Sequence, residues 1–477
     1  MNRPERLKRI DELAGENSNL DSFTAERMEF SELMFTELSE VLNEVHNMDA
    51  SLSFWKLAAE DHLLAEVLRK DNLREKQWAG APDWYAVVNY SNFPTIHERI
   101  RNAGGHFTRF LKTNRVKRKI DQQLRSCDEI YVGFKRLPVT EADKNNAAIV
   151  DRYYPFIFGL GNKKKRDKLN SIANQYDSLF LRNIIRRIPK VYVENFDKLY
   201  NGVELYSPEK KTFHVHLTDS LFETMMIAKY SEQGSKLIWY QHGCYYGEVV
   251  HKYRGYFEHT TGDLFRTWGY RNHEIDEPWS AYRLEAFKRK FKMSQNEAEQ
   301  KYDLMICYSA MGARGERLGV RETTEYLLSR VDSEKYPRIL ARPRPENSRS
   351  KASKQLDYIT DNRVTVAPDG SSIAKQVAES RLVFQMRIPS TNFMECVYCD
   401  HPVTGLLDND QPTEIVAPYY KFFLDEGVLH RDIRSAVQFL NDVDLENWWP
   451  RITGSPEYQS YKRKFANSDI FRKAIVG

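Results

Sequence analysis

The sequence lacks the features that stabilise secreted proteins and those that cross membranes. It has 477 residues but five cysteines, an odd number that provides no disulfide framework. No apolar stretch approaches the roughly 20 residues that a membrane-spanning helix requires, and the mean hydropathy is -0.64. Residues 1–6, MNRPER, lead into charged sequence without the apolar core of a signal peptide. We therefore expect a protein of the reducing cytoplasm.

A strong charge of one sign is also absent. Lys and Arg number 71 against 67 Asp and Glu, a net charge of +4, which is too small to indicate a nucleic-acid partner. Basic residues nevertheless cluster at 112–119, 163–166 and 182–190. Such clusters are typical of solvated helix faces. The alternative is a surface that attracts anionic lipid headgroups or a phosphorylated acceptor.

The common cofactor and metal motifs are missing as well. There is no GxGxxG fingerprint, no GxxxxGK[ST] loop, no HExxH and no paired Cys/His set. Cys396 and Cys399 form a single CxxC without a second pair, which favours two half-buried thiols over a metal site. The sequence therefore predicts no cofactor and no bound metal.

The chain does contain a long alternation of short apolar strands and helices. Helical spacing of apolar residues dominates residues 1–75, and the alternation begins near residue 125. The expected strands are 129–134, 212–217, 236–240 and 264–269, then, after a polar helical stretch at 272–300, 303–308, 337–341, 364–366, 382–384 and 402–407. The remainder reads as helical. Two βαβ series predict two Rossmann-like domains with parallel sheets, and a ligand beyond the carboxyl ends of the strands.

The most informative motif is WYQHGCYYGE at residues 239–248. An expected strand ends in His242 and enters a loop with two glycines, which permit close approach of a ligand to the backbone. Histidine titrates near neutrality, so His242 is a candidate general base or electrostatic stabiliser. Glu248, or Asp219 at the end of another expected strand, is a candidate partner. A structural histidine in a turn is the alternative.

A second motif, STNFME at residues 390–395, opens an expected helix. Hydroxyl groups beside the free amides of a helix start form a phosphate site, although Ser and Thr are also common helix caps. Arg342 and Arg344 lie in an RPRP run at a strand end, and arginine is suited to phosphate recognition. A surface ion pair is the alternative reading of these arginines.

Together these motifs resemble a family of transferases of bacterial surface-polysaccharide and O-antigen biosynthesis loci. The resemblance covers most of the chain, and it departs from the family at Cys244-Tyr245, where glycines are expected, and at Asn392 in place of Thr. The matching runs are Gln241-His242-Gly243, Tyr246-Gly247-Glu248, Thr267-Trp268-Gly269-Tyr270, Ser390-Thr391-Asn392-Phe393-Met394-Glu395, Pro418-Tyr419-Tyr420, Gly427-Val428-Leu429-His430, Trp448-Trp449, and, near the start, Leu42-Asn43, His46 and Phe54-Trp55.

The resemblance implies a GT-B glycosyltransferase fold without a catalytic metal, distantly similar to capsule Kdo transferases and teichoic-acid glycerophosphotransferases. It implies an acceptor domain at 126–285 with a helical part at 1–125. It also implies a nucleotide-sugar donor domain at 286–455 and a helix at 456–477 that packs back on the N-terminal domain. The two domains would face a cleft.

The resemblance and the motifs together give each candidate residue a role. The catalytic candidates are His242, Glu248 and Asp219. The donor-binding candidates are Arg342, Arg344, Ser309, Ser390, Thr391, Asn392 and Glu395, with the ribose on Glu395. The acceptor-side candidates are Gln241, Gly243, Tyr245 and Tyr246.

The expected reaction is transfer of a sugar from a nucleotide-activated donor to a lipopolysaccharide, O-antigen or capsule acceptor. A CMP-linked ulosonic acid is slightly favoured by analogy, and His401-Pro402 is a weak hint toward CMP. A polyol-phosphate transferase that uses a CDP-polyol, or a non-catalytic nucleotide- or glycan-binding protein, is the alternative. The basic clusters are consistent with peripheral attachment to the inner membrane, where lipid-linked acceptors lie.

Overall fold

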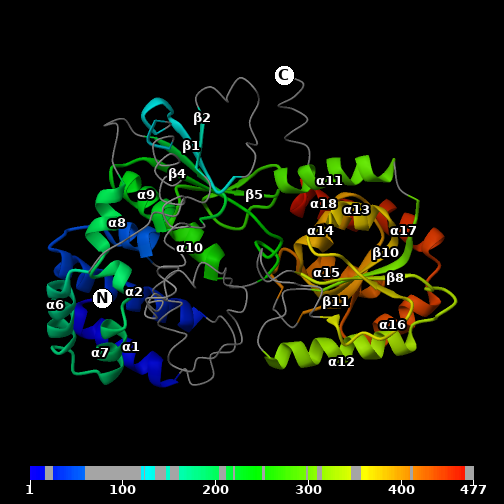
Figure 1. Cartoon of the computed structure of the whole chain (residues 1–477), viewed down its shortest axis with the longest axis horizontal. Helices are drawn as coiled ribbons and strands as arrows, with labels where there is room; N and C mark the ends of the chain where they lie inside the picture. The colour runs from blue at the N-terminus through cyan, green and yellow to red at the C-terminus, as the bar shows by residue number, and fades with distance from the viewer. Residues whose placement is uncertain are drawn as a thin grey trace, which may run out of the picture. The chain divides into compact units, whose positions relative to one another are not determined.

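The structure is a computed structural model of the chain (Figure 1). It describes residues 1–16, 25–59, 120–122, 124–134, 147–150, 161–203, 211–218, 221–249, 253–296, 299–308, 314–344, 356–408 and 412–467. The described residues form two compact units. The first contains those up to Tyr240 together with 253–265, and the second contains 241–249 and 266–467.

Helices make up much of the first unit. They are α1 (Arg3–Glu16), α2 (Ala25–His46), α6 (Lys163–Ala173), α7 (Leu179–Arg186), α8 (Phe196–Gly202), α9 (Leu221–Glu232) and α10 (Tyr253–Thr261), with a further helix at 52–59. Apolar residues three or four positions apart give α2 one buried face, formed by Phe30, Met34, Leu38, Val41 and Val45. This face packs α2 against α1 and α6.

Most of a parallel sheet forms the rest of the first unit's core, although its last strand, at residues 276–278, is grouped with the second unit. Over the described residues it has six strands in the order β2-β1-β3-β4-β5-β6, and β1 pairs in parallel with both β2 and β3. The strands are β1 (Glu129–Val132), β2 (Ala147–Val150), β3 (Thr212–Val215), β4 (Lys236–Tyr240), β5 (Leu264–Thr267) and β6 (Asp276–Pro278). Strands β2 and β6 are not among the strands expected from the sequence.

The second unit is built on another parallel sheet. In the described part of the chain it has six strands in the order β12-β11-β10-β7-β8-β9, all paired in parallel. They are β7 (Tyr302–Cys307), β8 (Ile339–Arg342), β9 (Val364–Val366), β10 (Ser380–Ile388), β11 (Val403–Leu407) and β12 (Leu429–His430). Strand β10 is buried at seven of its nine positions, as expected where helices cover both faces of a sheet.

The helices of the second unit lie on both faces of its sheet. Helices α11, α13 and α14 pack together, and α12 packs with α16 on the opposite face (Figure 1). Their bounds, with those of the C-terminal helices, are α11 (Tyr282–Gln295), α12 (Arg314–Arg330), α13 (Ile373–Ala378), α14 (Thr391–Tyr398), α15 (Ala417–Asp425), α16 (Ile433–Asp442), α17 (Leu445–Gly454) and α18 (Pro456–Phe465).

The two parallel sheets confirm the predicted α/β fold with two Rossmann-like units. The domain boundaries at 125, 285 and 455, and the packing of the last segment on the N-terminal domain, stay predictions. Among the described residues, no helix is both long and apolar enough to span a bilayer.

Candidate active site

The candidate site lies at the carboxyl edge of the second sheet. Strands β7 and β10 are neighbours there, although β8 and β9 separate them in sequence, so the strand order reverses between β7 and β10. Ligands of open α/β sheets bind outside the carboxyl ends of the strands at such a reversal. Arg342 ends β8, and α14 begins shortly after β10 ends at Ile388.

The first turn of α14 is held by its own side chains. The Ser390 hydroxyl accepts a hydrogen bond from the Phe393 amide at 3.1 Å and donates to Gln385 Oε1 at 3.2 Å. Asn392 accepts from Gln385 Nε2 at 2.5 Å and donates to Glu395 Oε2 at 3.2 Å. The backbone amides of Thr391 and Asn392 have no partner among the described residues, as is usual for the first positions of a helix. The turn therefore offers two free N–H groups to an anion.

The 241–249 loop runs beside this turn. The Thr391 side chain neighbours the buried Cys244 thiol, and a Cβ at Gly243 would lie 3.6 Å from Thr391 Oγ1. The structure thus joins the two motifs that the sequence analysis singled out, although about 150 residues separate them along the chain.

The shape of the loop is set by Gln241 and Gly247. The Gln241 side chain donates to the Gly243 carbonyl at 2.8 Å and accepts from the Trp268 amide at 2.7 Å. Gly247 has a φ of +72°, and a Cβ there would meet the Tyr270 ring at 2.6 Å. Only glycine fits such a position without strain.

His242 is half-buried and held from two sides. Its Nδ1 lies 2.9 Å from the Tyr246 hydroxyl. Its carbonyl accepts a hydrogen bond from Arg283 Nη1, on α11, at 2.8 Å. The sequence analysis missed Arg283, because a single exposed basic residue in a polar helix carries no recognisable signal.

Glu248 is buried away from solvent, at 1% exposure. Tyr461 and Tyr420 donate hydrogen bonds to its carboxyl group at 2.5 Å and 3.3 Å. Burial raises the pKa of Glu248 to about 8, although the two tyrosine hydrogen bonds oppose that rise. The carboxyl group thus connects the loop to α15 and α18.

Arg342, at the end of β8, and Glu395, on α14, interact electrostatically. Arg342 donates to Ser371 Oγ and to the Ser371 carbonyl, both at 3.2 Å, and to Gln376. Burial lowers the pKa of Arg342, while the charge of Glu395 opposes this. Burial raises the pKa of Glu395, and the charges of Arg283 and Arg342 oppose the rise. Two guanidinium groups therefore act on one buried carboxyl group.

Tyr245 lies near another cationic part of the same edge. Burial raises the pKa of its hydroxyl, and the charges of Arg387 and Arg344 oppose the rise. Arg387 forms an ion pair with Asp408, whereas Arg344 is exposed. Arg344 and Arg387 thus add positive charge near Tyr245, which Asp408 partly offsets.

The remaining sequence candidates lie elsewhere. Asp219 and Ser309 fall outside the described residues. His401 precedes β11, at the amino edge of the sheet, where burial lowers its pKa to about 3. In the described part of the chain no group of His, Cys, Asp or Glu residues could hold a metal ion.

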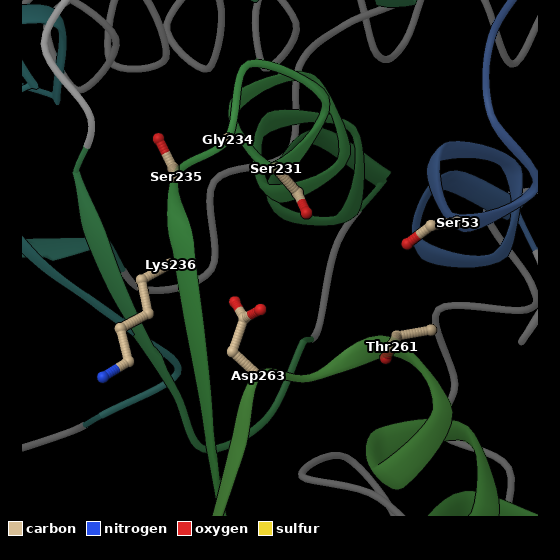
Figure 2. A pocket seen from close by; sticks show the side chains of 7 residues that line it. All are labelled: Ser53, Ser231, Gly234, Ser235, Lys236, Thr261 and Asp263. Atoms are coloured by element: carbon tan, nitrogen blue, oxygen red, sulfur yellow. The ribbon is translucent and has the colours of Figure 1, made fainter.

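A separate polar pocket lies in the first unit, at the amino ends of its strands. It is lined by Ser53, Ser231, Gly234, Ser235, Lys236, Thr261 and Asp263. Figure 2 shows the Asp263 carboxylate and the Ser231 hydroxyl directed into it. Because ligand sites of parallel sheets lie at the carboxyl edge, this pocket is not the candidate active site.

Comparisons with solved structures find several transferases at low similarity. The chain is similar to trehalose-6-phosphate synthase from Burkholderia multivorans (TM-score 0.39, 10% identity, covering 75% of this chain and 92% of that one). It is also similar to MurG from Acinetobacter baumannii (TM-score 0.34, 12% identity, covering 76% of this chain and 93% of that one). A third similar structure is the wall teichoic acid polymerase TagF (TM-score 0.34, 8% identity, covering 80% of this chain and 96% of that one). No curated protein matches the chain. At these TM-scores the fold rests on the two parallel sheets themselves, which form the two Rossmann-like units expected of a GT-B fold.

The family follows from a family model. The model of the LIC12162 family transferases matches residues 101–469. The chain therefore belongs to this transferase family, and the resemblance to a transferase family drawn from the sequence is confirmed.

Proposed function

We propose that the protein transfers a glycosyl group from a nucleotide-activated donor to a hydroxyl group of a bacterial surface glycan. One observation carries the proposal. The His242 loop lies against the first turn of α14, where Gly243 and Cys244 neighbour Thr391, at the edge of the sheet where Arg342 ends β8. A titratable group thus lies beside a phosphate-binding turn.

The donor phosphate would be bound by the free amides of Thr391 and Asn392 and by Arg342. These N–H groups attract negative charge before and after the sugar leaves. The internal hydrogen bonds of Ser390 and Asn392 keep the turn in its binding shape. We assign the donor ribose to Glu395, as the sequence motif suggests.

His242 would act on the acceptor. In the reaction the acceptor oxygen forms a bond to the anomeric carbon of the donor, and the bond from that carbon to the phosphate oxygen breaks. The imidazole takes the hydroxyl proton, and the phosphate leaves with the bonding electron pair. We assign Glu248 to holding the loop, because both tyrosine hydroxyls already occupy its oxygens.

The nucleotide is the first thing to test. CMP, CDP, UDP, GDP and dTDP are each added to the purified protein, and the melting temperature is followed, since a ligand of the folded state raises it. A shift with CMP supports an ulosonic acid donor, and a shift with another nucleotide redirects the donor assignment. Arg342→Ala should lose the shift. No shift with any nucleotide contradicts the proposal.

Product analysis separates glycosyl transfer from its nearest alternative. A glycosidic bond in the product supports the proposal. A phosphodiester instead means that the protein is a polyol-phosphate transferase. Nucleotide binding without turnover, on acceptors extracted from bacterial envelopes, means that it is a binding protein.

The acceptor would be lipid-linked and reached from the membrane surface. Lys163 and Lys164 on α6, and Arg186 and Lys190 at and beyond the end of α7, are exposed. Exposed basic residues are attracted to anionic lipids, and salt weakens the attraction. Cosedimentation with phosphatidylglycerol vesicles at low salt tests this, and Lys163→Glu with Lys164→Glu should reduce it. No cosedimentation of the wild-type protein at low salt contradicts membrane contact.

A further inference from the structure

We propose that Arg283 binds the donor phosphate and positions His242, and thereby couples donor binding to the placement of the base. The inference rests on the proposed function and adds a residue to it. Arg283 is in none of the motifs that the sequence analysis singled out, and its place in the fold brings it to the site.

The first step is the contact with the loop. Arg283 Nη1 donates to the His242 carbonyl at 2.8 Å, and this is its only hydrogen bond to the described residues. A guanidinium group has five N–H donors in a planar fork. The side chain is exposed, so its remaining donors stay available to a ligand.

Arg283 lies on a well-packed helix. Arg283 is the second residue of α11, whose Leu284, Phe287 and Phe291 are buried. These side chains hold α11 in the unit, where it packs against α13 and α14. A site on a packed helix keeps its geometry better than one on a loop.

The Arg283 charge also reaches both sides of the candidate site. The Arg283 charge acts on Glu395, one turn into α14, and on Cys244 in the loop. The guanidinium group therefore lies where the loop and the first turn of α14 meet. Arginine binds phosphate through two parallel hydrogen bonds, which fixes direction as well as affinity.

The consequence is coupling between two ligands. When the donor phosphate occupies the guanidinium fork, the side chain is fixed, and so is its bond to the His242 carbonyl. The base is then fully placed only with donor bound, and an acceptor meets a prepared base only after the donor has entered. Such coupling is a difference in binding free energy and is reciprocal.

The test compares Arg283→Ala, Arg283→Lys and the matched control Arg289→Ala, an exposed arginine on the same helix. Calorimetry uses whichever of the five nucleotides stabilises the wild-type protein. We expect Arg283→Ala to weaken nucleotide binding about 10- to 100-fold, the loss typical of a charged hydrogen bond. Arg283→Lys should recover part of the affinity, and Arg289→Ala should bind as wild type does.

A second measurement separates positioning from simple binding. In the wild-type protein, nucleotide should shift the His242 ring resonances, because Arg283 holds the His242 carbonyl. This shift should vanish in Arg283→Ala even at saturating nucleotide. Far-ultraviolet circular dichroism confirms that each variant is folded.

The outcomes distinguish the two proposals. If wild-type protein binds no nucleotide, the proposed function fails, and this inference fails with it. If wild type binds nucleotide and Arg283→Ala binds equally well, with unchanged His242 shifts, the inference alone is wrong. Weakened binding with His242 shifts intact at saturation overturns the coupling.

Discussion

Two glutamates, one in each unit, are both fully buried, but their carboxyl groups have different partners. Glu37 of the first unit is 0% exposed and Glu248 of the second is 1% exposed, and each accepts a hydrogen bond from at least one tyrosine. Glu37 also accepts from Arg3 at 2.8 Å and from Arg6 at 2.7 Å. Among the residues that the structure describes, Glu248 has two tyrosine donors and no cation.

Their pKa values move in opposite directions. Burial would raise both, but the Tyr176, Arg3 and Arg6 hydrogen bonds outweigh burial and lower the pKa of Glu37. At Glu248 burial outweighs the two tyrosines and raises the pKa to about 8. Burial alone therefore does not fix the charge state of a carboxyl group, and the presence of a cation decides it.

The largest expected effect is the pH dependence of the second unit. Glu248 binds its proton more tightly in the folded than in the unfolded chain, so its contribution to the free energy of unfolding is fully present below about pH 4.5. As the pH rises through about 8, the free energy of unfolding falls by on the order of 5 kcal/mol. Urea unfolding between pH 5 and 9 measures this loss.

The matched control for that prediction is Glu248→Gln, an amide of the same shape without a charge. It should be nearly as stable as wild type at pH 5 and more stable at pH 9. Parallel pH curves for the two proteins would show that Glu248 is ionised at neutral pH and that the comparison with Glu37 fails.

The next largest change in stability is expected when the charge of Glu37 is removed. Glu37→Gln removes the carboxylate that Arg3 and Arg6 share, and a buried cation without its partner typically destabilises by about 3–5 kcal/mol. Glu40, 2.6 Å from Arg6, remains, so we expect about 3 kcal/mol. Hydrogen exchange of the α2 amides at pH 7 measures it.

The control for Glu37 lies in acid. Its contribution is present above about pH 4.5 and is lost as the pH falls through its lowered folded value, the reverse of Glu248. Wild type and Glu37→Gln should therefore converge toward low pH. A constant difference between them down to pH 2 would contradict the charge argument.

The fold was predictable because its strands are apolar and regular. The runs at 303–308 and 382–384 correspond to β7 and β10. Both strands are buried along almost their whole length, so their apolar sequence alone indicates a strand. Strand β6, Asp276–Pro278, was not predictable. A three-residue strand with two acids and a proline has no strand pattern, and its neighbours alone determine it.

The site was predictable only in part, for a similar reason. Motifs marked His242 and Thr391, yet their proximity is a tertiary fact that spacing along the chain does not contain. The sequence also suggested Glu248 as a partner for His242. The structure gives His242 a hydrogen bond to Tyr246 and gives Glu248 bonds to residues about 170 and 210 positions away. Arg283 had no motif to mark it.

A smaller effect concerns the hydroxyls around Glu248. Tyr461→Phe removes the 2.5 Å hydrogen bond and Tyr420→Phe the 3.3 Å one. A typical hydrogen bond contributes about 1 kcal/mol, so we expect about that loss for Tyr461→Phe and less for Tyr420→Phe at pH 7. The Tyr461 hydrogen bond lowers the pKa of Glu248, so its removal should raise that pKa. The loss of stability at alkaline pH should then become larger and extend to higher pH. Equal unfolding curves for the two variants would contradict the ranking.

The smallest effect is expected at the edge of the Glu37 cluster. The Arg3 side chain is 49% exposed, against 8% for Arg6. Partly exposed ion pairs contribute about 1 kcal/mol or less, because water screens them, and Glu37 keeps Arg6 and Tyr176 when Arg3 is removed. Arg3→Ala should therefore destabilise the first unit by no more than about 1 kcal/mol, and Arg6→Ala by clearly more, in urea unfolding at pH 7. If Arg3→Ala proved the more damaging, exposure would not rank the two cations.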